Sequence, residues 1–272
     1  MSMPTIKELF NLKGRVALVT GGAGWLGTAM SEALAEAGAN LVIASRSVEK
    51  CQALADRLAQ NGQECIALKL DVNDEAQVRS VVDQSADHFG RLDILINNAY
   101  SGPVHDSSDA TDIDNATGDD LLASFKGNTL QYFAAAQQAV RHMRKVGGGA
   151  IINNGSMYGV VGSYPDAYTD LPVNSPINYH ACKGGVVHMT RHMAVYWAKD
   201  NVRVNAISPG PFPKTDMKGK LPGFIERLEK KTPLGRMGLP HELKGLTLLL
   251  ASDAGSFITG QNILVDGGWT AW

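Results

Sequence analysis

The chain has 272 residues, of which 44% are hydrophobic and 19% charged, and its formal net charge is −2. This composition favours a large apolar core over a disordered chain, and it gives no basic field for nucleic acid or an anionic membrane. Three scattered cysteines, and no apolar run near the roughly 20 residues of a membrane helix, predict a cytoplasmic protein outside the membrane.

Short apolar runs alternate with segments of helical period along the chain. We predict strands at 15–20, 41–44, 65–70, 92–96, 150–154, 202–207 and 263–265. The intervening helices run from 26 to a stop at Gly38, from caps at Ser47 and Asn73, and over 121–144, 179–199, 224–231 and 241–252. A polar stretch at 101–120 contains six aspartates.

This alternation predicts an α/β fold, namely a single Rossmann domain over 1–272. Its seven-stranded parallel sheet should carry helices on both faces, because parallel strands need crossover connections. Ligands of such sheets bind beyond the carboxyl ends of the strands. Residues that directly follow strands are therefore the first candidates for a functional site.

The first strand runs directly into a glycine-rich turn that opens a helix. Glycines let the backbone approach a phosphate closely, and a helix N-terminus favours negative charge. This context predicts a nucleotide site, although a tight turn without a ligand is the alternative. The predicted contacts are Gly21, Gly24, Trp25 and Leu26.

The end of the second strand bears on the choice of dinucleotide. An NAD-preferring site usually carries an acidic residue there, whereas this chain has Ser45 and Arg46. An arginine suits a 2′-phosphate through charge-assisted hydrogen bonds. We therefore predict NADP as the preferred cofactor, with NAD possible.

Polar residues follow several strands at the same predicted edge. Tyr179 and Lys183 are four apart on a predicted helix, so they share one face. A nearby ammonium and a cationic nicotinamide could lower the pKa of a tyrosine far enough for it to act as a base. Ser156 follows the fifth strand, Asn98 and Ala99 the fourth, and Pro209 and Gly210 the sixth.

These motifs together resemble the short-chain dehydrogenase/reductase family over residues 12–268, nearly the whole chain. The matching positions are Thr20–Gly27, Asn97–Ala99, Asn128, Ser156, Tyr179, Lys183 and Pro209-Gly210. The resemblance implies that Tyr179 is the general acid/base, that Lys183 lowers its pKa and holds the nicotinamide ribose, and that Ser156 binds the substrate oxygen. It further implies a water-holding role for Asn128 and cofactor contacts by Asp71, Val72 and Thr215.

The chain departs from the family pattern at three places. Trp25 and Tyr100 stand where glycines are usual, and residues 157–178 form an insertion between Ser156 and Tyr179. We expect this insertion to wall a pocket for a polar substrate, with a surface flap as the alternative. Residues 211–233 resemble the family's substrate lid.

These observations predict hydride transfer between NADP(H) or NAD(H) and a small polar secondary alcohol or ketone, such as a sugar, sugar acid, polyol or cyclic alcohol. A 3-oxoacyl thioester reductase is the alternative, and a nucleotide-sugar epimerase and a non-catalytic NADP sensor are remoter ones. We expect no metal site, because the His188 and His192 pair lacks a third ligand. We also expect a homodimer or homotetramer, with Trp269 and Trp272 reaching a neighbouring copy.

Overall fold

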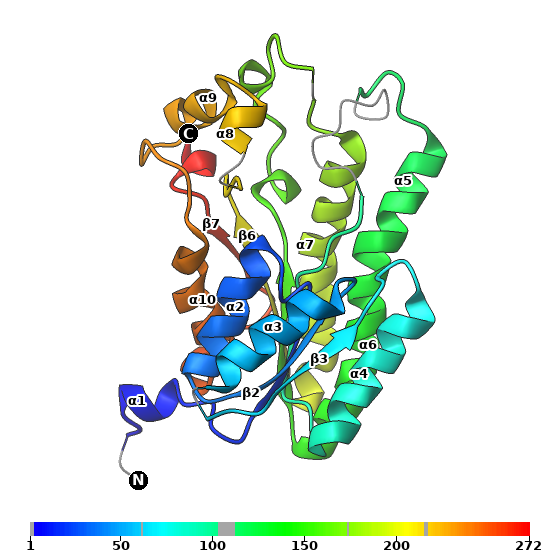
Figure 1. Ribbon diagram of the computed structural model, residues 1–272, viewed down its shortest axis with the longest axis vertical. Helices are drawn as coiled ribbons and strands as arrows, with labels where there is room; N and C mark the ends of the chain where they lie inside the picture. The colour runs from blue at the N-terminus through cyan, green and yellow to red at the C-terminus, as the bar shows by residue number, and fades with distance from the viewer. Residues whose placement is uncertain (1–2, 61, 103–111, 173, 215–216) are drawn as a thin grey trace.

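The computed structural model describes residues 3–60, 62–102, 112–172, 174–214 and 217–272. Within this part of the chain, seven parallel strands form one sheet in the order β3-β2-β1-β4-β5-β6-β7 (Figure 1). The predicted α/β class and seven-stranded parallel sheet are confirmed. The strands are β1 (Val16–Thr20), β2 (Asn40–Ser45), β3 (Cys65–Lys69), β4 (Ile94–Asn97), β5 (Gly149–Asn154), β6 (Val202–Pro209) and β7 (Asn262–Val265).

Helices cover both faces of the sheet, as predicted (Figure 1). One apolar core joins the sheet to α4 (Glu75–Phe89), α6 (Gln131–Met143) and α7 (Ile177–Trp197). The other core joins it to α2 (Trp25–Glu36), α3 (Val48–Ala59) and α10 (Lys244–Ala251). No described helix is long and apolar enough to cross a bilayer. The strands are buried on both sides, which explains their continuous apolar runs.

The structure corrects several predicted helix boundaries. The helix expected over 121–144 consists of α5 (Gly118–Phe125), a π-helical turn at Lys126–Leu130 and α6. Two short helices were not predicted: α1 (Ile6–Leu9) and α8 (Met217–Lys220). Helix α9 (Phe224–Lys231) has its predicted bounds. The helix predicted over 241–252 begins instead with a 3₁₀ turn at Pro240–Leu243, and α10 follows this turn.

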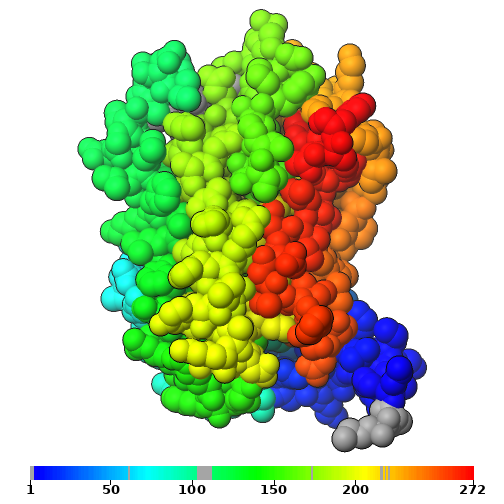
Figure 2. Space-filling view, turned by 180° about the vertical axis from the view of Figure 1, so that it is seen from behind, coloured from blue at the N-terminus to red at the C-terminus, as the bar shows by residue number. Residues whose placement is uncertain are grey.

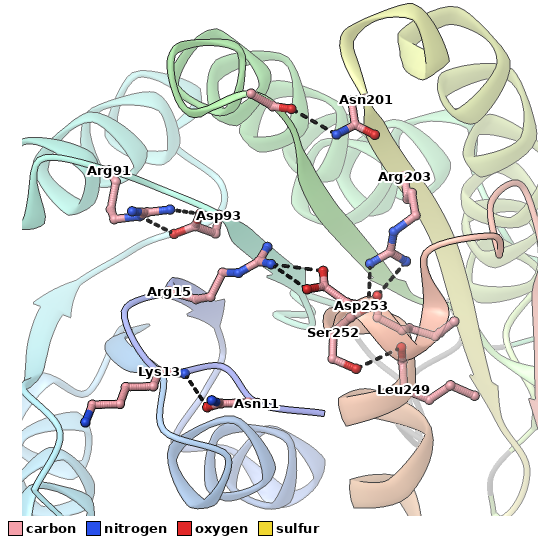
Figure 3. Close-up of polar contacts among 12 residues, drawn as sticks. Asn11, Lys13, Arg15, Arg91, Asp93, Asn201, Arg203, Leu249, Ser252 and Asp253 are labelled. Carbon is pink, nitrogen blue, oxygen red and sulfur yellow. Dashed lines mark hydrogen bonds and ion pairs between the residues drawn. The ribbon is translucent and has the colours of Figure 1, made fainter. Parts of the chain in front are cut away.

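Polar contacts hold together the amino ends of the strands, at the edge opposite the candidate site (Figure 3). The buried carboxylate of Asp93 accepts the backbone N–H of Val16 at 2.9 Å and pairs with the guanidinium of Arg91 at 2.7 Å. Arg203 donates to the carbonyl oxygens of Leu250 and Ser252. These bonds satisfy backbone groups that would otherwise be buried without partners.

We expect Asp93→Ala to lower the free energy of unfolding by about 3 kcal/mol, because it leaves the buried N–H of Val16 without an acceptor. Urea denaturation measures the change. The control is Arg15→Ala, which removes an ion pair with Asp253, whose side chain is 58% exposed. That control should cost less than about 1 kcal/mol. Equal losses in the two variants would contradict this account.

Candidate active site

The carboxyl ends of the central strands bring the predicted site residues to one edge of the sheet. Strand β1 ends at Thr20, β4 at Asn97, β5 at Asn154 and β6 at Pro209. Thr20 pairs with Asn97, and Asn97 pairs with Asn153, so the carboxyl ends of β1, β4 and β5 are aligned across the sheet. The parallel register therefore places the glycine turn, the loop after β4 and the loop after β5 side by side.

The turn after β1 depends on two glycines. Gly21 has a φ of +64°, and an added Cβ would lie 2.9 Å from the Cα of Ala99. At Gly27 a Cβ would lie 2.1 Å from the carbonyl oxygen of Gly21. The amide of Asn98 donates to the carbonyl oxygens of Thr20 and Gly21 at 3.2 and 3.0 Å. The resulting turn is tight, and Gly24 within it is exposed.

Helix α2 begins at Trp25, and no side chain caps its first turn at Gly24. The free N–H groups of such a turn are suited to bind a pyrophosphate, so the observed cradle fits a dinucleotide. The indole N–H of Trp25 donates to the carbonyl oxygen of Phe212 at 3.0 Å. The residue that replaces the usual glycine thus connects the turn to the segment after β6. The side chain of Leu26 packs against the core of that face.

The residues predicted to contact the adenosine half lie at the ends of β2 and β3. Arg46 is exposed at the end of β2, beside the half-buried Ser45. The hydroxyl of Ser45 lies 2.9 Å from the sulfur of Cys51 and donates to the carbonyl oxygen of Ser47 at 3.2 Å. Asp71 follows β3, and its carboxylate accepts two hydrogen bonds from Asn73. An exposed guanidinium at this strand end fits a 2′-phosphate.

Ser156, Tyr179 and Lys183 meet at the carboxyl end of β5. Ser156 is buried close to Tyr179, and its hydroxyl accepts the backbone N–H of Tyr158 at 3.1 Å. Tyr179 and Lys183 lie on the same face of α7, with the lysine Nζ 5.8 Å from the tyrosine ring centroid. The geometry joins a hydroxyl, a phenol and an ammonium in one group, in which Ser156 and Lys183 are buried and Tyr179 is half-buried.

Burial dominates the protonation of this group. It raises the pKa of Tyr179, although the nearby hydroxyl of Ser156 acts in the opposite direction. Burial also lowers the pKa of Lys183 to about 8. The upward shift for Tyr179 is opposite to the implied lowering by Lys183. The reason is that burial has the largest effect on the pKa of Tyr179. The ammonium of Lys183 donates to the carbonyl oxygen of Asn154, at 2.6 Å.

Two residues at this edge escaped the sequence analysis. Asn154 accepts from Lys183 through its carbonyl and donates through its amide to Asn98, at 2.8 Å. The hydroxyl of Tyr132 lies 3.4 Å from the same carbonyl oxygen. Tyr132 lies one helical turn after Asn128, and Asn154 ends a strand at the carboxyl edge. These positions were the only sequence signals for the two residues.

Three tyrosine rings surround the ammonium of Lys183. Its Nζ lies 5.8, 5.6 and 5.8 Å from the ring centroids of Tyr100, Tyr132 and Tyr179. Tyr100 also contacts Tyr179 edge to face, with centroids 5.4 Å apart, and burial raises its pKa. The ring that replaces the usual glycine therefore packs against the candidate catalytic pair. Cation–π contacts of this kind stabilise a desolvated ammonium.

Asn128 lies in the π-helical turn between α5 and α6. Its amide nitrogen donates to the carbonyl oxygens of Ser101 and Ser124 at 2.9 and 2.6 Å. Its Oδ1 is buried and has no partner among the described residues, and the Oδ1 of Asn154 is in the same state. Such unpaired acceptors are suited to hold a water or a ligand group.

Part of the segment 157–178, which we expect to be an insertion, packs into the molecule. Its Tyr158, Ala167 and Tyr168 are buried in a cluster with Phe224 of α9 and Trp269. Trp269 is 2% exposed, so the prediction that it reaches a neighbouring copy is wrong.

Four predicted cofactor contacts remain to be placed. Val72 is buried, Ala99 packs against the core, and Pro209 ends β6 directly before Gly210. Thr215 lies outside the described residues.

Comparison with known proteins gives matches over nearly the full length. A family model described as enoyl-(acyl carrier protein) reductase matches residues 22–270. Galactitol 2-dehydrogenase (L-tagatose-forming) of Cereibacter sphaeroides is 35% identical over 271 residues, which cover 98% of this chain and 99% of the relative.

Two crystal structures superpose on the same fold. A short-chain type dehydrogenase/reductase from Mycobacterium marinum has a TM-score of 0.85 and 35% identity, covering 99% of this chain and 100% of the other. A gluconate 5-dehydrogenase from Burkholderia cenocepacia J2315, in complex with NADP and tartrate, has a TM-score of 0.85 and 34% identity, covering 98% and 100%. The chain therefore belongs to the short-chain dehydrogenase/reductase family, as its motifs predicted.

Proposed function

We propose that the chain is an NAD(P)-dependent oxidoreductase that interconverts a small polar secondary alcohol and its ketone. The observation that carries the proposal is the meeting of Ser156, Tyr179 and Lys183 beside the glycine turn. Similarity to a galactitol dehydrogenase and a gluconate dehydrogenase supports polyols, sugars and sugar acids as substrates, and cyclic alcohols remain candidates.

The proposed roles follow from the contacts at the sheet edge. Tyr179 takes the hydroxyl proton of the alcohol, or returns it to the ketone oxygen, while Ser156 hydrogen-bonds the same oxygen. Tyr179 accepts the proton as a phenolate and becomes a phenol, and in the reverse direction the phenol protonates the ketone oxygen. Lys183 stabilises the phenolate form by its charge and binds the nicotinamide ribose. The unpaired Oδ1 of Asn128 positions a water that connects Lys183 to solvent. A bound nicotinamide cofactor accepts or supplies the hydride at the reacting carbon.

A spectrophotometric assay tests this function. Polyols, sugars, sugar acids and cyclic alcohols are offered with NADP and with NAD, and the absorbance of the reduced nicotinamide is followed. We expect turnover with at least one of these classes. Turnover confined to 3-oxoacyl thioesters would favour the alternative reductase, and no turnover with any alcohol or ketone would contradict the proposal.

We further propose that NADP is the preferred cofactor, on the basis of the exposed guanidinium of Arg46. Arg46→Asp should weaken NADP binding by roughly tenfold to a hundredfold, because it replaces charge-assisted hydrogen bonds with repulsion. Binding of NAD, which lacks the phosphate, should change far less. Equilibrium titration of the two dinucleotides measures both constants. Lys145→Asp makes the same charge change elsewhere and is the control.

We propose that a second copy of the chain covers the outer face formed by α5, α6 and α7, giving a homodimer or homotetramer. Large apolar side chains are exposed along these helices, including Leu122 at 69% and Val195 at 81%. Figure 2 shows α7, in yellow, beside the green helices on one face of the molecule. Apolar side chains exposed along neighbouring helices are suited to contact a second copy. A cytoplasmic location remains a prediction from the cysteine content.

The oligomer proposal gives a direct expectation for sedimentation. The native protein should sediment as a dimer or tetramer at micromolar concentration, and Val195→Asp should shift it toward monomer, because a charge in an apolar interface is costly. Ile6→Asp, at a side chain 69% exposed in α1 and away from these helices, is the control. A native protein that sediments as a monomer would refute the proposed interface.

A further inference from the structure

The side chain of Tyr100 contacts both members of the Tyr179 and Lys183 pair. Its ring centroid lies 5.4 Å from that of Tyr179, with an angle of 68° between the two planes. The Nζ of Lys183 lies over the ring of Tyr100, 5.8 Å from its centroid, and is 5.8 Å from the centroid of Tyr179. A half-buried ring from the loop after β4 therefore contacts the phenol and the ammonium on which the proposed reaction depends.

Hydrogen bonds on both sides of Tyr100 hold its backbone in place. The carbonyl oxygen of Ala99 accepts from the amide of Gln131 at 2.9 Å, and the carbonyl oxygen of Ser101 accepts from the amide of Asn128 at 2.9 Å. Both donors are buried side chains at the junction of α5 and α6. The backbone from which the ring projects is thus set by the fold, as a positioning role requires.

Tyr100 is not a second base for the reaction. Burial raises the pKa of its phenol, and a negative charge on Tyr179 raises that pKa further. Tyr100 therefore stays neutral when Tyr179 is ionised. Its effect on the pair comes from the face and the packing of the ring.

A neutral aromatic face attracts a cation, and the attraction is largest where water is excluded. Lys183 is 4% exposed, so its ammonium has lost most of its hydration and gains from such a face. The ammonium in turn favours the phenolate form of Tyr179, because opposite charges stabilise each other. Edge-to-face packing also sets the plane of the Tyr179 ring. A glycine at position 100, which is usual in the family, would supply neither effect.

We propose that Tyr100 is a positioning residue for this reaction, whose ring keeps the ammonium of Lys183 beside Tyr179 and holds the Tyr179 ring in one plane. The inference rests on the proposed function and concerns the same site. Tyr132 presents a second ring to the ammonium, with its centroid 5.6 Å from Nζ, but it is fully buried in α6. Tyr100 lies in a loop, so its replacement disturbs the core less.

The test compares Tyr100→Leu with Tyr100→Phe at saturating NADP, on the alcohol substrate that the absorbance assay identifies. Leucine keeps an apolar side chain without an aromatic face, whereas phenylalanine keeps the ring. We expect Tyr100→Leu to lower kcat by about tenfold. The midpoint of the rise of kcat with pH should move up by roughly half a unit to one unit, because a less stable ammonium favours the phenolate less. Tyr100→Phe should restore both quantities.

Tyr196→Leu is the matched control. The Nζ of Lys199 lies 5.3 Å from the ring centroid of Tyr196, at the exposed end of α7, so the control removes the same kind of contact away from the site. It should keep the native kcat and the native pH profile. The variants leave unchanged the other titratable groups around the pair, namely Tyr132, Tyr158, Tyr168, His180 and Cys182.

The dissociation constant of NADP shows whether each variant keeps a folded site, and it should stay within about threefold of the native value. If Tyr100→Leu binds NADP more weakly than that, Tyr100→Met takes its place, since its flexible apolar side chain also lacks an aromatic face.

The outcomes separate the two proposals. A native kcat and pH profile in Tyr100→Leu overturns the inference and leaves the proposed function intact. An equal loss in Tyr100→Phe overturns it as well, because the effect would then belong to the hydroxyl. A lower kcat with an unshifted pH profile has the same consequence, since it indicates a merely structural role. Failure of the native protein to oxidise or reduce any alcohol or ketone overturns the proposed function, and the inference fails with it.

Discussion

Tyr179→Phe should lower kcat by about a thousandfold while the dissociation constant for NADP stays within about threefold of the native value. General acid–base catalysis contributes on the order of a hundredfold to ten-thousandfold, and phenylalanine lacks the hydroxyl that we propose exchanges the proton. The ring itself stays, so its edge-to-face contact with Tyr100 is preserved. Steady-state kinetics and equilibrium titration of NADP measure the two quantities.

A matched control comes from the same helix. Tyr196 is 59% exposed near the end of α7, far along the helix from Tyr179 and Lys183. Tyr196→Phe loses an identical hydroxyl and should keep native kcat. Native turnover in Tyr179→Phe would remove this residue from the proposed mechanism. An unchanged biological signal without turnover would instead support the NADP-sensor alternative.

Lys183 should make the stability of the protein depend on pH. Its pKa is lowered from 10.5 to about 8 in the folded protein, so the unfolded chain binds more protons between these pH values. The free energy of unfolding therefore rises with pH across that window, by about 3 kcal/mol from this group. Below pH 8 the buried ammonium lowers the free energy of unfolding by the whole of this amount, and above pH 10.5 it no longer lowers it.

Lys183→Met should lose this rise, which is obtained as the difference between native and variant urea-denaturation curves at neutral pH and near pH 10.5. Other alkaline titrations occur in both proteins and cancel in that difference. Lys199→Met removes an exposed lysine near the end of the same helix and should keep the native slope. If the free energies of unfolding of the native and Lys183→Met proteins changed with pH in parallel, burial of the Lys183 ammonium would not destabilise the fold.

The sequence predicted the sheet well because buried parallel strands carry a local signal. Each apolar run of β1, β2 and β5 is bounded by polar or glycine residues, and the residues after these runs define the carboxyl edge. Tyr179 and Lys183 were predicted on one face by helical spacing alone, and the structure has them so. Local pattern therefore sufficed for the sheet and for the placement of Tyr179 and Lys183 on one helix face.

Contacts between distant segments were not predictable in the same way. The π-helical turn that contains Asn128 does not interrupt the apolar period of its helix, so one continuous helix was expected. The bond from Trp25 to Phe212 joins residues 187 apart. The same holds for Trp269, which is buried under the insertion by packing that no local pattern records. Long-range packing decided each of these cases.

Isotope transfer tests the central claim most directly. A substrate alcohol deuterated at its carbinol carbon is oxidised with NADP, and the reduced cofactor is isolated and weighed by mass spectrometry. The account predicts one deuterium in the reduced nicotinamide, and native Tyr179 should be needed for this transfer at a measurable rate. Reduced cofactor without deuterium, or deuterium released to water, would contradict hydride transfer at this site.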